Sequence, residues 1–114
     1  MSEVRLPAQL EVSGLVRRVN GEGGFATIMA KGEPDAGTIL VLASFRGEAF
    51  RAWERMPQAD GNRRWECVRR SDSSGYGELA EWLERRKTQD PDLWIVELDI
   101  AEAERFIGLT ASPD

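Results

Sequence analysis

One short segment, 38–46, constrains the fold more than any other because its strand pattern is apolar on both sides. The two alternating sets are Ile39, Val41 and Ala43 on one side and Leu40 and Leu42 on the other. Successive side chains of a strand point to opposite faces of its sheet, so such a strand belongs in the interior of a sheet that is covered above and below. The pattern therefore excludes a sheet with one solvent-exposed face.

The segment before it, 24–31, has a similar pattern, and the two are joined by a glycine-bounded turn, 32–37. Placing the two segments as a hairpin sets Ala30 opposite Ile39 and Ile28 opposite Val41. We therefore expect both segments to be neighbouring interior strands.

A second hairpin is predicted from segments 48–56 and 63–70 around the turn dipeptide Asp60-Gly61. This register determines which residues lie opposite each other and which face of the sheet each residue occupies. The expected pairs are Met56 with Trp65, Arg55 with Glu66 and Trp53 with Val68. One face carries Phe50, Ala52, Met56, Trp65 and Cys67; the other carries Trp53 and Val68 ringed by Arg51, Arg55, Arg64 and Arg70. A helical interpretation of Ala49, Ala52, Trp53 and Met56 stays open.

Three helices and one further strand complete the pattern. Apolar residues at helical spacing predict helices over 6–20 and 78–88, and the continuous apolar run in segment 93–97 predicts another interior strand. Asp99 and Glu102 fit a capping box for a last helix over 100–107 that ends at Gly108. The order α-β-β-β-β-α-β-α predicts an α+β fold with a five-stranded, mixed, mostly antiparallel sheet and helices on both faces, a three-layer sandwich. We expect residues 1–114 to form a single domain, with an ordered core over 5–108 and a frayed tail over 109–114.

The composition excludes several catalytic classes. The chain has no histidine and one cysteine, Cys67, which rules out a Ser-His-Asp or Cys-His arrangement, an internal disulfide, and any zinc site built on histidine or on cysteine alone. We expect Cys67 to be a buried, unreactive thiol. No residue is assigned as catalytic or metal-binding and no cofactor is predicted, which favours a non-enzymatic module.

Charge is unevenly distributed along the chain. The net charge is −5, yet segment 46–70 holds seven arginines against four acidic residues. A net acidic protein repels phosphate backbones, so nucleic acid is a disfavoured partner. No apolar run is long enough to span a membrane and the first residues do not resemble a signal peptide, so we expect a soluble cytoplasmic protein.

The arginine-rich face of the second hairpin is the candidate binding site. It comprises Arg51, Trp53, Arg55, Arg64 and Arg70. In the simplest interpretation Trp53 packs under a helix and the arginine stems cover its rim while their charged heads reach water. The functional hypothesis is that this face binds a protein partner, an anionic ligand or a second copy of the chain. In an alternative hypothesis, Trp53 stacks on single-stranded nucleic acid and the arginines contact phosphates.

Two weaker motifs remain. Glu97 and Asp99 share one side of a strand and could hold Mg²⁺ in a metal-dependent enzyme, although the expected cap already explains Asp99. Residues 75–80, Gly-Tyr-Gly-Glu-Leu-Ala, match the glycine pattern of dinucleotide-binding proteins. Five residues separate these glycines from the preceding strand, however, where that motif has a tight turn. We therefore expect a loop and a helix start there.

Three longer runs carry a family resemblance. They are Lys31-Gly32-Glu33-Pro34-Asp35-Ala36-Gly37, Glu54-Arg55-Met56-Pro57-Gln58-Ala59-Asp60-Gly61-Asn62-Arg63-Arg64-Trp65-Glu66 and Gln89-Asp90-Pro91-Asp92-Leu93-Trp94-Ile95-Val96-Glu97-Leu98-Asp99. With these runs, the chain resembles from about residue 5 to 107 an uncharacterised family of short bacterial proteins known only as a domain of unknown function. The resemblance implies a free-standing bacterial domain. It supplies no catalytic residue or cofactor.

Overall fold

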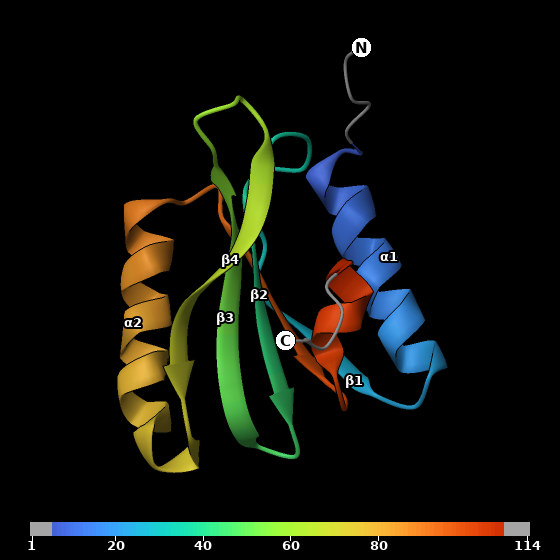
Figure 1. Cartoon of the computed structure of the whole chain (residues 1–114), viewed down its shortest axis with the longest axis vertical. Helices are drawn as coiled ribbons and strands as arrows, with labels where there is room; N and C mark the ends of the chain where they lie inside the picture. The colour runs from blue at the N-terminus through green and yellow to red at the C-terminus, as the bar shows by residue number, and fades with distance from the viewer. Residues whose placement is uncertain (1–5, 109–114) are drawn as a thin grey trace.

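A five-stranded mixed sheet forms the centre of the computed structural model, which describes residues 6–108 (Figure 1). The strands are β1 (Phe25–Ala30), β2 (Ile39–Phe45), β3 (Glu48–Pro57), β4 (Arg63–Ser71) and β5 (Trp94–Asp99), and their order across the sheet is β1-β5-β2-β3-β4. Two α-helices, α1 (Ala8–Gly21) and α2 (Tyr76–Gln89), and two short 3₁₀ helices, η1 (Ser73–Gly75) and η2 (Ala103–Ile107), complete the fold. The predicted fold class and element order are confirmed, and β3 is a strand rather than a helix.

Strand β5 lies between β1 and β2, so the expected first hairpin is wrong. β5 runs parallel to β2, pairing Val96 with Val41, and antiparallel to β1, pairing Val96 with Ile28. β2 and β5 are interior strands, as predicted. β1 is instead an edge strand, and its Phe25 is 73 % exposed. The error arises because turn residues favour a local hairpin, whereas the later apolar strand β5 separates β1 from β2 and supplies each with a ladder partner.

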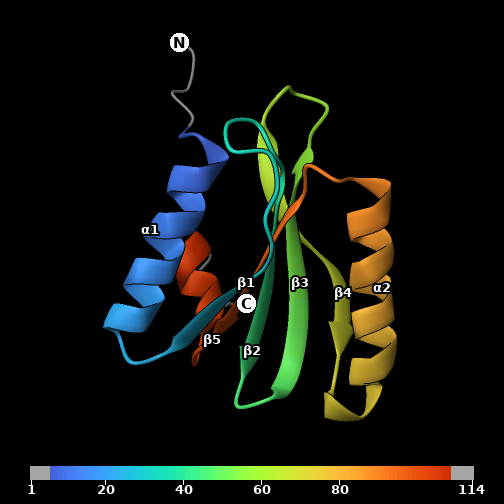
Figure 2. The same ribbon diagram turned by 180° about the vertical axis from the view of Figure 1, so that it is seen from behind.

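Two apolar cores cover the two faces of the sheet, which confirms the three layers (Figures 1 and 2). On one face α1 and η2 pack against alternate residues of the central strands. This core includes Val12, Leu15, Val19, Val41, Ala43, Val96, Leu98 and Phe106. On the other face α2 packs Leu79 and Leu83 against the intervening residues. That core includes Leu40, Leu42, Phe50, Ala52 and Ile95.

The β3–β4 hairpin differs from the predicted register by one residue near its tip. Arg55 pairs with Trp65 and Met56 with Arg64, because the loop spans residues 58–62 rather than the Asp60-Gly61 dipeptide alone. The register shifts between Ala52 and Trp53, where β4 has a bulge. Beyond this bulge the pairs formed by β3 residues 50–52 lie in the register that the sequence predicts. Trp65 and Cys67 therefore share a face with Trp53, not with Phe50 and Ala52.

The last helix is shorter than expected and has no capping box. It is a 3₁₀ helix that begins at Ala103, and the residue before it, Glu102, has a left-handed backbone with φ of 54° and makes no capping hydrogen bond. Asp99 instead accepts a hydrogen bond from the backbone N–H of Arg46 at 2.8 Å. The predicted end at Gly108 is correct, and its φ of 84° suits glycine. The predicted tail over 109–114 lies outside the described residues.

Gly32 marks the close approach between the β1–β2 loop and the start of β5. A Cβ at this position would overlap the backbone carbonyl of Asp92, while the next residue, Glu33, donates its N–H to that carbonyl at 3.0 Å. A side chain here would therefore push the loop away from β5.

Replacing Gly32 with alanine should lower the free energy of unfolding by about 2–3 kcal/mol, since backbone atoms cannot rotate out of the way. The matched control is Gly14→Ala. Gly14 lies inside α1, where an added Cβ meets nothing within 4 Å, so this change should raise stability by about 0.5–1 kcal/mol. Urea denaturation followed by circular dichroism measures both. Equal effects of the two substitutions would contradict the close approach.

Candidate functional site

The sheet brings four of the five predicted site residues to one face. Arg51, Trp53 and Arg55 alternate along β3 on the face that α1 and η2 cover, and Arg70 of β4 pairs with Arg51. Arg64 pairs with Met56 and thus lies on the opposite face, because the loop shifts the register at the tip by one residue. The predicted group of five is therefore divided between the two faces of the sheet.

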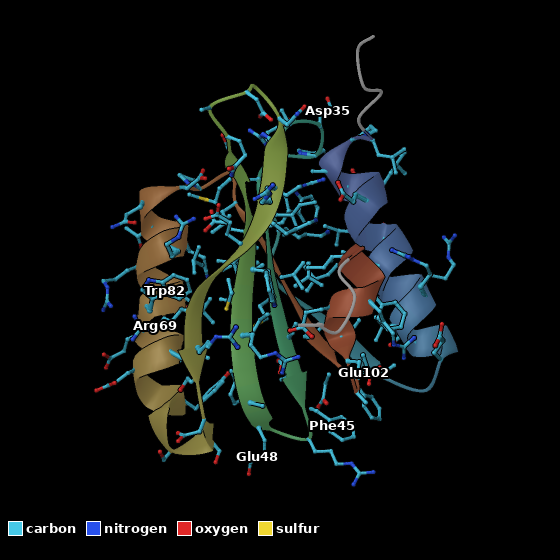
Figure 3. The ribbon with its side chains drawn as sticks, in the orientation of Figure 1. Asp35, Phe45, Glu48, Arg69, Trp82 and Glu102 are labelled. Atoms are coloured by element: carbon cyan, nitrogen blue, oxygen red, sulfur yellow. The ribbon has the colours of Figure 1, made fainter. Side chains whose placement is uncertain are left out.

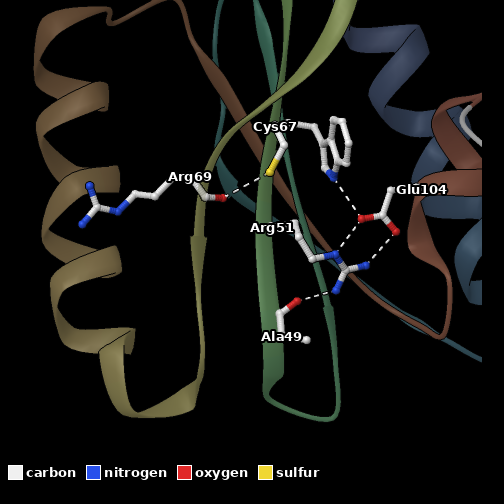
Figure 4. A network of polar contacts seen from close by, with 6 residues as sticks. Ala49, Arg51, Cys67, Arg69 and Glu104 are labelled. Carbon is white, nitrogen blue, oxygen red and sulfur yellow. Dashed lines mark hydrogen bonds and ion pairs between the residues drawn. The ribbon is translucent and has the colours of Figure 1, made fainter. Parts of the chain in front are cut away.

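Arg51 and Trp53 are both bonded to Glu104 of η2 (Figure 4). The guanidinium of Arg51 donates from Nε to Glu104 Oε2 at 2.6 Å and from its terminal nitrogen to Oε1 at 2.7 Å. The indole N–H of Trp53 donates to Glu104 Oε2 at 3.0 Å, and Arg51 also donates to the carbonyl of Ala49. One carboxylate thus accepts three hydrogen bonds, two of them from a bidentate arginine.

This environment shifts the ionisation of Glu104. Partial burial of the carboxyl group favours its neutral form and opposes ionisation, but the hydrogen bonds from Arg51 and Trp53 and the charge of Arg51 outweigh burial. The pKa of Glu104 is therefore lower than its ordinary value. Glu104 is ionised at neutral pH and fastens η2 to β3.

Arg55 makes an equivalent link to α1. Its guanidinium donates to Glu11 Oε1 at 2.8 Å and lies over the ring of Trp65, 4.9 Å from the ring centroid. Trp53 and Trp65 both pack against the core beneath α1. The simplest sequence interpretation of Trp53 thus agrees with its position, but the arginine heads at positions 51 and 55 bond to carboxylates rather than reaching water.

Three arginines of β4 remain exposed without an ion pair among the described residues. They are Arg63, Arg64 and Arg70. Their neighbour Arg69 lies over the ring of Trp82 on α2, 5.5 Å from its centroid (Figure 3). The half-buried Cys67 lies between Arg64 and Arg69 along β4. Cys67 was expected to be buried. It is half-buried because it belongs to the outer strand of the sheet.

The other two motifs lack the surroundings of a catalytic or nucleotide site. The Glu97 carboxylate accepts a hydrogen bond from the buried Ser44 hydroxyl at 2.9 Å. No group of three or more potential metal ligands occurs within the described part of the chain. At the glycine motif, Asp72 accepts hydrogen bonds from Ser74 and Gly75 and thereby caps η1. This motif follows β4, an antiparallel edge strand, so it is not the turn of a nucleotide-binding unit.

Sequence reasoning did not identify Glu11 and Glu104, the acidic partners of the arginine face. Glu104 lies 53 residues from Arg51, and Glu11 lies 44 residues from Arg55. No local spacing connects them. The one available signal is that η2 and α1 had to cover the face from which both arginines project.

The architecture defines a class of α+β domains with a mixed five-stranded sheet, and comparisons with known proteins place the chain within it. The family model described as "Protein of unknown function (DUF1491)" matches residues 6–108. The chain belongs to this family, which confirms the resemblance seen in the sequence.

Solved structures of relatives share the fold. The chain is similar to a DUF1491 family protein from Caulobacter crescentus CB15 solved by crystallography, with 32 % identity, a TM-score of 0.77 and coverage of 96 % of this chain and 98 % of that one. It is also similar to protein Atu0922 from A. tumefaciens, solved in solution, with 34 % identity, a TM-score of 0.74 and coverage of 97 % and 99 %. A search of curated proteins finds no match. Within residues 6–108, no helix has the length and apolar character needed to cross a membrane.

Replacing Glu104 with glutamine should lower the free energy of unfolding at pH 7 by about 1–3 kcal/mol, because a charge-assisted pair is lost and Arg51 is left partly buried. The pKa of Glu104 is lower in the folded state, so its stabilisation is complete above the unfolded-state value and disappears as pH falls through the folded one. Denaturation curves of both proteins should therefore converge in acid.

The control for this prediction is Glu81→Gln on the exposed surface of α2, which should change stability by less than about 0.5 kcal/mol. A difference between wild type and Glu104→Gln that is the same at pH 7 and in acid would contradict the role given to the ionised carboxylate.

Proposed function

We propose that the protein is a non-enzymatic module that binds an acidic, extended segment of a partner protein along the edge strand β4. A peptide can add to an exposed sheet edge through backbone hydrogen bonds, while its side chains contact residues on alternate faces. Free cations at such an edge select acidic side chains in the partner.

The observation that carries this proposal is the division of the arginines. Arg51 and Arg55 are bonded to acidic residues of the same chain. The exposed Arg63, Arg64 and Arg70 have no ion pair within residues 6–108, and they belong to a strand that pairs with a neighbour on one side only. Cationic side chains and unpaired backbone groups are therefore available together.

The positions of these arginines suit an added strand. By the register of the hairpin, Arg64 lies on the α2 face and Arg70 on the α1 face. A segment lying along β4 would thus meet one cation on each face of the sheet. The tip adds Arg63 within a shallow hollow that it shares with Arg64, Gln58, Asp60 and Asn62.

The same contacts make the other candidate functions weaker. Stacking of a nucleic-acid base needs an open face of Trp53, which packs against the core and donates its N–H to Glu104. A divalent cation at Glu97 and Asp99 would have to compete with the hydrogen bonds that Ser44 and Arg46 already make to these carboxylates.

The test is the double substitution Arg64→Glu and Arg70→Glu in the full chain. The probe is a fluorescent peptide of about ten alternating glutamate and valine residues, a length that covers one edge strand. We expect the reversed charges to weaken its binding by about tenfold or more, and salt to weaken binding to the unmodified protein. Fluorescence anisotropy at two salt concentrations measures both effects.

Arg17→Glu is the matched control, since Arg17 is exposed on α1, away from β4. It should bind the peptide within about twofold of wild type. The proposal fails if the double variant binds as well as this control, or if a single-stranded oligonucleotide binds more tightly than the peptide.

A further inference from the structure

Two pairs of arginines lie on β4, one on each side of its bulge. Arg63 and Arg64 lie next to the hairpin tip, and Arg69 and Arg70 lie near the other end of the strand. Among residues 6–108, none of the four forms an ion pair. Arg69 lies over the ring of Trp82, a contact that leaves its positive charge in place. Two groups of positive charge therefore follow one edge of the sheet.

The bulge changes the spacing at which a neighbouring strand meets these pairs. Along β4, four residues separate Arg64 from Arg69. Across the ladder, Arg64 pairs with Met56 and Arg69 with Ala52, and only three residues of β3 lie between those partners. The extra residue of β4 is Val68, which the register leaves out. A regular strand beside β4 therefore passes from one arginine pair to the other with three intervening residues.

Each arginine pair presents one cation to each face of the sheet. By the register of the hairpin, Arg64 and Arg69 lie on the face that α2 covers. Neighbouring side chains of a strand alternate between faces, so Arg63 and Arg70 lie on the α1 face. A strand added along β4 thus meets two adjacent cations on opposite faces at each end.

The middle of β4, between the arginine pairs, has a different character. Trp65 and Cys67 are half-buried on the α1 face, and Glu66 is exposed on the α2 face. Opposite charges that face each other across a ladder are favourable, and like charges directly opposite are unfavourable. The strand therefore attracts acidic side chains at its two ends and repels an acidic side chain at its centre.

We propose that the segment bound by β4 carries two pairs of acidic residues separated by three residues, of which the central one is not acidic. This inference rests on the proposed function and specifies the sequence that the site selects. The acidic pairs lie beside the two arginine pairs, and the central residue lies opposite Glu66. The pattern is the same in both directions along the chain, so it applies to a segment that runs parallel or antiparallel to β4.

Charge decides which strand can occupy this edge. Charged side chains on an edge strand discourage the addition of another strand, and antiparallel pairing of β4 with a second copy of itself would bring arginines against arginines. Acidic side chains at the matching positions convert this repulsion into attraction. The bulge does not prevent pairing, since β3 pairs with β4 on both sides of it.

Two labelled peptides of equal composition test the spacing by fluorescence anisotropy with the full chain at low salt. The first contains Glu-Glu-Thr-Val-Thr-Glu-Glu between flanking valines, and the second has the same residues with its four glutamates contiguous. We expect the first to bind about fivefold more tightly, because contiguous glutamates reach only one arginine pair at a time.

A third peptide tests the register. It replaces the central valine of the first peptide with glutamate, which lies opposite Glu66. We expect it to bind about threefold more weakly than the first, although it carries one more negative charge. Glu66→Gln should abolish this difference. The matched control is Glu81→Gln, since Glu81 is also exposed but lies on α2; this variant should retain the difference.

The spacing and the proposed function fail in different ways. Equal binding of the first two peptides contradicts the spacing, and the proposed function still stands if Arg64→Glu with Arg70→Glu weakens both. Tighter binding of the third peptide than of the first contradicts the register. Absence of binding by every acidic peptide overturns the spacing and the proposed function together.

Discussion

The central position of β5 is the constraint on which the rest of the structure depends. This strand is the last in the chain, yet its alternate residues enter both cores, with Val96 and Leu98 on one side and Ile95 on the other. The sheet is therefore complete only when the C-terminal part of the chain has inserted β5 between β1 and β2. Such long-range pairing slows folding, because the entropy of closing a long loop must be overcome before the distant strands meet. At the entry to β5, Gly32 lies against the backbone carbonyl of Asp92.

The same constraint determines which arginines are free. β5 and β2 occupy the middle, so β3 lies within reach of both covering elements on the α1 face. Glu104 of η2 forms an ion pair with Arg51, and Glu11 of α1 forms one with Arg55. Exposed ion pairs contribute little to stability, but a bidentate and half-buried pair such as that of Arg51 has the geometry that contributes most. The arginines of β4 lie one strand further out, where Arg69 lies over the ring of Trp82 on α2.

Much of this architecture could be predicted from the sequence, because periodicity reports burial. The apolar pattern of 38–46 identified an interior strand, and the pattern of 6–20 identified the buried stripe of α1. Strand order could not be predicted, since the pattern of 24–31 fits a neighbour of β2 as well as a neighbour of β5. The register of β3 and β4 was wrong near the tip because Gln58 and Asn62 extend the loop. The arginine-rich face was predicted from the abundance of arginine in segment 46–70. Its acidic partners, Glu11 and Glu104, could not be predicted without the fold.

The division of the arginines into a bonded and a free set is the central claim, and the exchange of their side-chain protons tests it most directly. The measurement is a ¹H–¹⁵N spectrum of the arginine Nε–H groups. Arg51 donates from Nε to Glu104 at 2.6 Å. Its signal should therefore persist at neutral pH and exchange slowly with water. The corresponding signals of Arg63, Arg64 and Arg70 should exchange rapidly. If the Nε–H of Arg51 exchanges as fast as that of Arg64, the arginine face is not fastened to η2 and the account is wrong.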